Sequence, residues 1–154
     1  MKVLTWMVLL PAALLVACQS SPKEIPVIVT SENVAKLQGR QWELKSMTLD
    51  SRDIVMDIEA NLTLAFGPNG KVTGYAAVNR FNGTYSFSPD GNLSWPGPGF
   101  VTTRKAGPPE LMEKERAYLR ALPQTDRAIL KGHILLLQND GESTILTFLE
   151  VGSS

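Results

Sequence analysis

The sequence predicts an α+β protein that is mainly β: a strongly curved antiparallel sheet, or an incomplete barrel, with one helix packed against it. Three observations lead to this prediction. Apolar and polar residues alternate in several short segments, which is the pattern of half-buried strands. Turn sequences such as Asn69-Gly70 separate these segments at hairpin spacing. One segment bounded by prolines has helical spacing instead.

The strands are predicted from the period-two pattern. Four segments alternate between apolar and polar residues, at 41–45, 61–66, 81–87 and 92–95. Two later segments, 134–137 and 145–149, are nearly continuous apolar runs, so we expect both of their faces to be covered. Turns are expected at 67–70, 89–91, 132–133 and 139–141, where Gly, Asn, Asp and Pro gather.

The predicted helix lies between Pro108-Pro109 and Pro123. Proline is tolerated in the first helical turn, where its missing N–H would have no partner, and Pro123 ends the helix. We expect the apolar side of this helix to pack against the open side of the sheet. Its residues with helical spacing are Leu111, Met112, Tyr118, Leu119 and Leu122.

The N-terminus has the features of a secretory signal. Residues 3–17 are apolar apart from Thr5 and follow Lys2, and the run is shorter than the roughly 20 residues of a membrane span. Its end, Leu-Val-Ala-Cys at 15–18, resembles the lipobox of bacterial lipoproteins. The resemblance implies cleavage before Cys18 and several acyl chains on that residue, which together anchor a protein stably. The alternative is a plain signal with an incidental cysteine.

We therefore divide the chain into a signal peptide at 1–17, a lipidated cysteine and flexible linker at 18–33, and one domain at 34–154. The apolar part of the linker, at 25–29, is an alternative edge strand, which Pro26 disfavours. In bacterial lipoproteins, a residue other than Asp after the anchor implies export to the outer membrane, and here that residue is Gln19. We expect a monomer on the periplasmic face of that membrane. Cys18 is the sole cysteine, so the domain must be stable through its core alone.

The charged residues point away from nucleic acid as a partner. The chain has 15 Lys and Arg against 15 Asp and Glu, and no run of basic residues. The single histidine, His133, lies in a predicted turn, and we expect it to be structural or exposed. A metal site needs several ligands at suitable spacing, so we expect neither a metal nor another cofactor.

Two separated motifs resemble one family. Residues 74–85 read Gly-Tyr-Ala-Ala-Val-Asn-Arg-Phe-Asn-Gly-Thr-Tyr. They resemble the core motif of the META domain, also called the HslJ-like domain, which runs roughly Gly-x-x-Gly-Cys-Asn-x-Phe-x-Gly-x-Tyr. Residues 103–108, Thr-Arg-Lys-Ala-Gly-Pro, resemble the family's Thr-Arg-x-Ala-Cys-Pro. The resemblance extends over about 37–149.

The chain departs from the family pattern at three positions. Val78 and Gly107 stand where relatives often have cysteine, and Ala77 stands where the motif has glycine. The resemblance implies that the two cysteine positions form an interacting pair. We therefore expect the Cα atoms of Val78 and Gly107 to lie within about 7 Å, the reach of a disulfide. Because both cysteines of the family pattern are absent, an activity that depends on a thiol at these positions is excluded in this protein.

The resemblance implies an envelope protein, often a lipoprotein, linked to heat tolerance and antibiotic resistance, with no general enzymatic activity. We therefore expect a non-enzymatic, membrane-anchored lipoprotein that supports outer-membrane integrity or stress tolerance by binding an envelope protein or an apolar ligand. One alternative is a pilot-like or chaperone-like lipoprotein that holds a partner segment or an acyl chain between helix and sheet. Another is a hydrolase that uses Glu115.

Glu115 is the most informative candidate residue. It lies four positions after Leu111 and three before Tyr118, so it shares the apolar face of the helix. A carboxylate there must be paired or protonated. We expect Arg80 or Arg104 to be its partner.

Two interpretations of that pair remain open. Glu115 is either a catalytic acid or one half of a buried ion pair that fixes the helix on the sheet. Asn79 is either a ligand-binding residue or a side chain that bonds to the backbone at an irregular strand end.

Overall fold

The computed structural model describes residues 24–56 and 60–152. A continuous antiparallel sheet dominates the fold, in the order β1-β10-β11-β12-β2-β4-β5-β6-β9, with β3 beside β2 and with β7 and β8 as a separate pair. The strands are β1 (Val27–Ile28), β2 (Trp42–Leu49), β3 (Arg52–Ile54), β4 (Thr63–Phe66), β5 (Lys71–Ala76), β6 (Asn79–Thr84), β7 (Ser86–Phe87), β8 (Leu93–Ser94), β9 (Val101–Thr102), β10 (Arg127–Lys131), β11 (Ile134–Gln138) and β12 (Ile145–Glu150).

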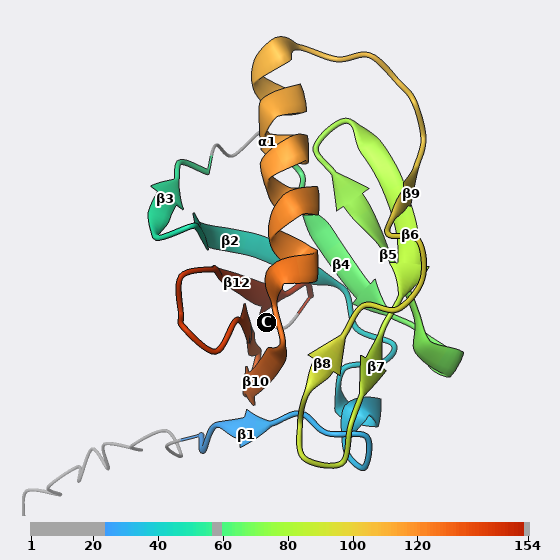
Figure 1. Cartoon of the computed structure of the whole chain (residues 1–154), viewed down its shortest axis with the longest axis vertical. Coiled ribbons are helices and arrows are strands. Elements are labelled where there is room, and N and C mark those ends of the chain that lie inside the picture. The colour runs from blue at the N-terminus through green and yellow to red at the C-terminus, as the bar shows by residue number, and fades with distance from the viewer. Residues whose placement is uncertain (1–23, 57–59, 153–154) are drawn as a thin grey trace, which may run out of the picture.

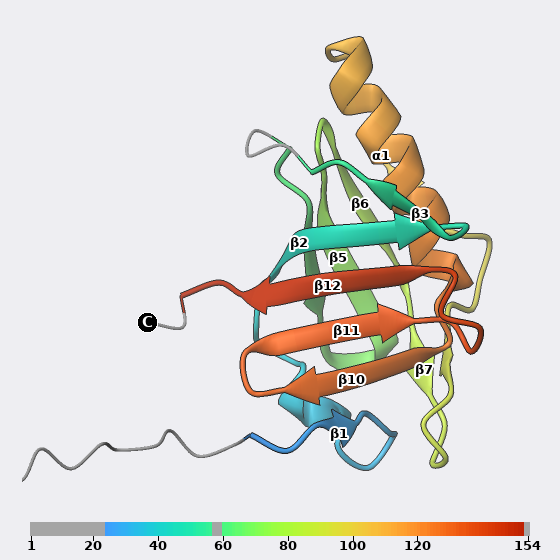
Figure 2. The same ribbon diagram turned by 90° about the vertical axis from the view of Figure 1, so that its left-hand side faces the viewer.

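The sheet bends into two walls. Strands β10, β11, β12 and β2 form the wall that faces the viewer in Figure 2, and β4, β5, β6 and β9 form the wall on the right of Figure 1. Among the described residues no strand ladder joins β1 to β9, so the barrel stays open. Helix α1 (Pro109–Ala121) packs against the inner side of the sheet, and short 3₁₀ turns lie at Val34–Lys36, Pro68–Gly70 and Leu122–Gln124. The predicted fold class and the predicted helix are confirmed.

A bulge in β2 makes the corner between the walls. The register between β2 and β12 shifts by one residue at Lys45. Before the bulge Trp42 and Leu44 are buried, and after it Met47 and Leu49 are buried, so the inward positions change from even to odd numbers. A bulge bends its strand and increases the local twist. Strand β2 can therefore pair with β12 over most of its length and with β4 at its start.

The core fills the space between the two walls and the helix. Tyr118 of α1 is fully buried, its ring packs edge-on against Phe81 at 5.8 Å between centroids, and its hydroxyl donates to the Thr63 carbonyl at 3.1 Å. Burial raises the pKa of Tyr118 well above its usual value, so the hydroxyl stays protonated as a donor. Ala121 and Leu122 are also fully buried. No helix in the described residues is both long and apolar enough to cross a membrane.

Two expectations need correction. Strands β11 and β12 are not covered on both faces: buried and more accessible residues alternate, and Ile134 and Leu149 are 38% and 41% exposed. The reason is that the helix packs on the inner side of the sheet. The last part of the predicted flexible linker is ordered, because β1 pairs with β10 and Val29 is buried. Cys18 and the signal segment lie outside the described residues.

The β5–β6 hairpin contains a strained residue. Ala76 pairs with Asn79, so Ala77 and Val78 form a two-residue loop. Ala77 has a φ of 62°, whereas Val78 does not have a positive φ. The N–H of Val78 donates to the Ala76 carbonyl at 2.7 Å, so Ala77 is the central residue of a γ-turn with positive φ, which is a strained conformation for a residue with a side chain. The residue that departs from the family's glycine therefore retains a backbone conformation suited to glycine.

We predict that Ala77→Gly stabilises the protein by about 1 kcal/mol, because a side chain at positive φ costs about 1–2 kcal/mol and glycine's flexibility in the unfolded chain offsets part of the gain. Urea denaturation of the purified variants measures the change. Ala106→Gly is the matched control, since Ala106 is exposed and its φ is not positive. A loss of stability at Ala77 equal to that at Ala106 would contradict the prediction.

Candidate functional site

A buried polar cluster joins β6, the segment after β9 and helix α1. Asn79 is 2% exposed, and its Nδ2 donates to Oε1 and Oε2 of Glu115 at 2.9 and 3.2 Å. The backbone N–H of Asn79 donates to Glu115 Oε2 at 2.9 Å. Its Oδ1 accepts from Thr103 Oγ1 and from the N–H of Lys105, both at 2.8 Å. We call these four residues the Asn79–Glu115 latch.

The latch corrects the predicted ion pair. Glu115 is buried, as expected, but its bonds come from Asn79, whereas Arg80 and Arg104 are exposed. Successive side chains of a strand point to opposite faces, so the inward direction of Asn79 sends Arg80 outward. There the guanidinium carbon of Arg80 lies 5.3 Å from the centre of the Tyr75 ring. Both carboxylate oxygens of Glu115 accept hydrogen bonds from Asn79, whose amide is neither a general acid nor a general base at neutral pH. The latch therefore has the chemistry of a structural contact.

Val78 and Gly107 lie in contact, as the resemblance predicted. A Cβ atom built on Gly107 would lie 3.4 Å from Val78 Cβ and 2.6 Å from its Cγ2. With the Cβ positions that close, the Cα atoms are within about 7 Å, which confirms the expectation. Because any side chain at Gly107 would collide with Val78, the pair replaces a covalent link by packing.

The outer face of the wall formed by β4, β5, β6 and β9 is hollowed. One hollow there has a volume of about 860 Å³, and two neighbouring hollows of about 400 and 370 Å³ share Thr73 with it. We call this surface the outer trough. None of the residues that line any of these three hollows is Asp or Glu. The outer trough is defined here by Gln41, Lys71, Thr73, Tyr75, Arg80 and Asn82.

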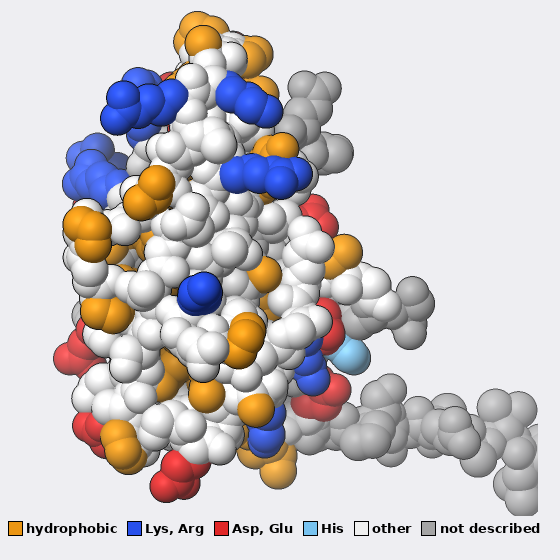
Figure 3. All heavy atoms as spheres, turned by 90° about the vertical axis from the view of Figure 1, so that its right-hand side faces the viewer, with side chains coloured by type: hydrophobic (Ala, Val, Ile, Leu, Met, Phe, Trp, Pro, Cys, Tyr) orange, Lys and Arg blue, Asp and Glu red, His pale blue; other side chains and the backbone are white. Residues whose placement is uncertain are grey.

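The strand register places the polar side chains of the outer trough next to one another. Thr73 is opposite Asn82, and Tyr75 is opposite Arg80, in the β5–β6 ladder. The Cβ atoms of opposed residues in an antiparallel pair are about 5 Å apart, so the two side chains can contact the same ligand. Figure 3 shows this side of the molecule, with Lys and Arg gathered over its upper part and Asp and Glu at its lower end and margins.

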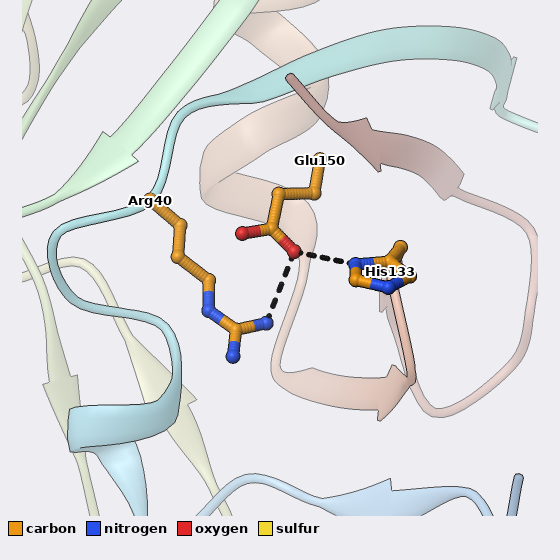
Figure 4. A network of polar contacts seen from close by, with 3 residues as sticks. All are labelled: Arg40, His133 and Glu150. Carbon is orange, nitrogen blue, oxygen red and sulfur yellow. Dashed lines mark hydrogen bonds and ion pairs between the residues drawn. The ribbon is translucent and has the colours of Figure 1, made fainter. Parts of the chain in front are cut away.

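A second polar cluster joins the segment before β2, the turn between β10 and β11, and the end of β12. Oε2 of Glu150 lies 3.2 Å from Nη1 of Arg40 and 2.8 Å from Nδ1 of His133 (Figure 4). The His133 side chain is 59% exposed, in a turn as predicted. In the described ranges, no three His, Cys, Asp or Glu residues lie in an arrangement that could hold a metal ion. The sequence analysis singled out neither this cluster nor Thr73, Tyr75 and Asn82.

The sequence profile of the META domain family matches residues 35–152. The chain belongs to the META domain family. No curated protein matches it in sequence.

Three solved structures share the fold of this META domain. A protein from Burkholderia xenovorans, solved by NMR, is 23% identical with a TM-score of 0.65, over 87% of this chain and 97% of that one. A DUF4847 family protein from Bacteroides vulgatus, solved by crystallography, is 13% identical with a TM-score of 0.57, over 75% and 95%. A further protein solved by NMR is 22% identical with a TM-score of 0.52, over 75% and 92%.

The geometry explains why the META motif has these residue types. A Cβ at Gly74 would collide with the Thr63 carbonyl oxygen and the Phe81 ring, so two strands approach each other closely there. A Cβ at Gly83 would lie 2.6 Å from the Phe100 ring. Asn79 carries both a donor and an acceptor, which the latch uses at once. Asn79 of the first motif thus forms hydrogen bonds with Thr103 and Lys105 of the second motif.

We predict that Val78→Cys with Gly107→Cys forms a disulfide when the META domain is exported to the periplasm. The Cβ separation is close to that of native disulfides, and Gly107 does not have a positive φ. A mobility shift without reductant measures the bond. Gly107→Cys alone is the control and should destabilise the domain, because its Cβ would meet Val78. Free thiols in a folded double variant would contradict the alignment of the two motifs.

We predict that Glu115→Ala costs about 2–3 kcal/mol of unfolding free energy, because it leaves two buried N–H donors of Asn79 without their acceptor. Glu113→Ala, on the exposed side of α1, should change stability by no more than about 0.5 kcal/mol. Chemical denaturation compares them. A cycle with Asn79→Ala should give a coupling of at least about 0.5 kcal/mol, and additive losses would show that the contact contributes nothing.

Proposed function

We propose that this META domain protein is a non-enzymatic lipoprotein of the bacterial cell envelope that acts by binding a ligand or partner in the outer trough. The observation that carries the proposal is the chemistry of this surface. Thr73 and Asn82 offer hydrogen-bond donors and acceptors on paired strands, Arg80 adds a charge, and no carboxylate lines the hollows. A concave surface with convergent polar groups on a rigid sheet has the character of a binding site.

The sequence supports a place at the membrane. The apolar run at 3–17 and the lipobox resemblance at Cys18 argue for a lipid anchor, and Gln19 argues for the periplasmic face of the outer membrane. Strand β1 begins at Val27, only a short stretch after Cys18, so an anchor there would keep the domain near the bilayer. From that position, binding would support outer-membrane integrity or tolerance to stress and antibiotics.

The interior of the fold argues against the two alternatives. Side chains fill the space between helix and sheet, where Tyr118, Ala121 and Leu122 are fully buried. A hollow near the end of the helix, beside Leu119, has about 140 Å³, less than the roughly 300 Å³ of a small ligand site. A second hollow of about 340 Å³ lies between α1 and β3, but Glu110, Glu113 and Lys114 line it, and these charged groups do not suit an acyl chain. Glu115 is buried against Asn79, which argues against its use as the acid of a hydrolase.

The anchor is tested by Cys18→Ala. We expect the wild-type protein to take up a metabolic acyl label and to partition into the detergent phase. The variant should lose the label, because the modified thiol is gone, and Ser20→Ala should keep it. An unlabelled wild-type protein that stays in the aqueous phase would refute the anchor.

The binding surface is tested by photo-cross-linking in intact cells from the full-length protein. A photoreactive residue at Thr73 lies in the outer trough, and one at Thr147 of β12 lies on the opposite wall as a matched control. We expect a reproducible adduct from position 73 and much less from position 147. Equal capture from both positions, or capture from 147 alone, would refute the outer trough as the binding surface.

A further inference from the structure

We propose that the outer trough binds an anionic saccharide, with its phosphate or carboxylate group at Arg80 and its hydroxyls along Thr73 and Asn82. The ligand is a sugar chain or a glycolipid headgroup, since both present the same chemistry. The inference rests on the proposed function, because it specifies what the outer trough binds.

The charge of the outer trough favours an anion. The chain as a whole balances 15 basic against 15 acidic residues, yet the lining residues of the three hollows include Arg40, Lys71 and Arg80 and no acid. Arg40 is paired with Glu150. Neither Lys71 nor Arg80 forms an ion pair with any residue that the structure describes. Two cations therefore face solvent beside hydrogen-bonding groups, where an incoming anion gains charge-assisted bonds.

Arg80 is held in place before any ligand arrives. Its guanidinium carbon lies 5.3 Å from the centre of the Tyr75 ring, and the two residues are opposed in the β5–β6 ladder. A hydrogen bond from Arg80 and its positive charge lower the pKa of the Tyr75 hydroxyl, with a smaller contribution from Lys105. This shift reflects a positive potential at that end of the outer trough. A planar guanidinium stacked on a ring keeps N–H edges available for a phosphate or carboxylate.

The neutral residues favour a saccharide over other anions. Thr73 and Asn82 each offer both a donor and an acceptor, which matches hydroxyl groups that are both. The β5–β6 ladder fixes their spacing, because the two residues are directly opposed. Contiguous hollows of about 860, 400 and 370 Å³ suit an extended ligand. Val101 lines two of these hollows, but it is 60% exposed and forms no deep apolar pocket of the kind that the anchor residue of a peptide partner needs.

The test is calorimetric titration of the full-length protein in detergent micelles. The probes are tetragalacturonate as the acidic sugar chain, chitotetraose as the neutral sugar chain, and polyglutamate as an anion without sugar. A phosphorylated glucosamine lipid added in the same detergent tests the lipid-borne source, and phosphatidylcholine in that detergent is its control. We expect tetragalacturonate or the phosphorylated glucosamine lipid to bind, and chitotetraose, polyglutamate and phosphatidylcholine to bind at least about tenfold more weakly.

The variants locate the site. Arg80→Gln should weaken binding about tenfold by removing a charge-assisted contact, and Arg52→Gln, a matched change on exposed β3, should not alter it. Unchanged thermal melting would show that both variants are folded. Failure of both anionic sugar probes, equal binding of polyglutamate, or equal loss from Arg52→Gln would overturn the inference. An adduct from position 73 together with no saccharide binding would overturn it while leaving the proposed function in place.

Discussion

The contact between Glu115 and Asn79 holds the elements of this META domain together. A buried carboxylate is costly unless every oxygen finds a donor, and Asn79 supplies donors from both its side chain and its backbone. Oδ1 of the same Asn79 side chain accepts hydrogen bonds from Thr103 and Lys105, which belong to a segment without regular structure. One residue thus ties the helix, the sheet and the segment between β9 and α1.

The latch and the outer trough are two sides of the same strand. Because side chains alternate along β6, fixing Asn79 toward the core fixes Arg80 toward solvent, and Asn82 follows on the same outer side. The position of the charge in the outer trough therefore depends on a buried contact that no ligand touches. A substitution in the latch should disturb binding indirectly, by loosening β6, without removing any group of the surface.

The sequence predicted those parts of the fold that depend on local patterns. Prolines delimit the helix, and alternation marks β2, β4, β6 and β8. The bulge at Lys45 was missed, although two successive polar residues, Lys45 and Ser46, interrupt the alternation there. Two-sided burial of β11 and β12 was wrong, because an apolar run does not reveal on which side a helix will pack.

The candidate site was only partly predictable for a similar reason. The helical spacing of Glu115 predicted its burial, but its partner depended on which way β6 faces, and charge complementarity wrongly favoured an arginine. The outer trough was missed because each of its residues is an ordinary outward-facing strand residue, and the surface arises from the register between strands. The contact of Val78 with Gly107 was predicted because the family pattern supplied a pairing that composition alone could not.

The amide exchange rate of Lys105 tests the central claim most directly. This N–H lies in an irregular, exposed segment, and in the structure it is bonded to Oδ1 of Asn79. If the latch holds the segment, Lys105 should exchange as slowly as the core amides of β6, far more slowly than its neighbour Arg104, and Glu115→Ala should accelerate it. Exchange of Lys105 as fast as that of Arg104 in the wild-type protein would contradict the account.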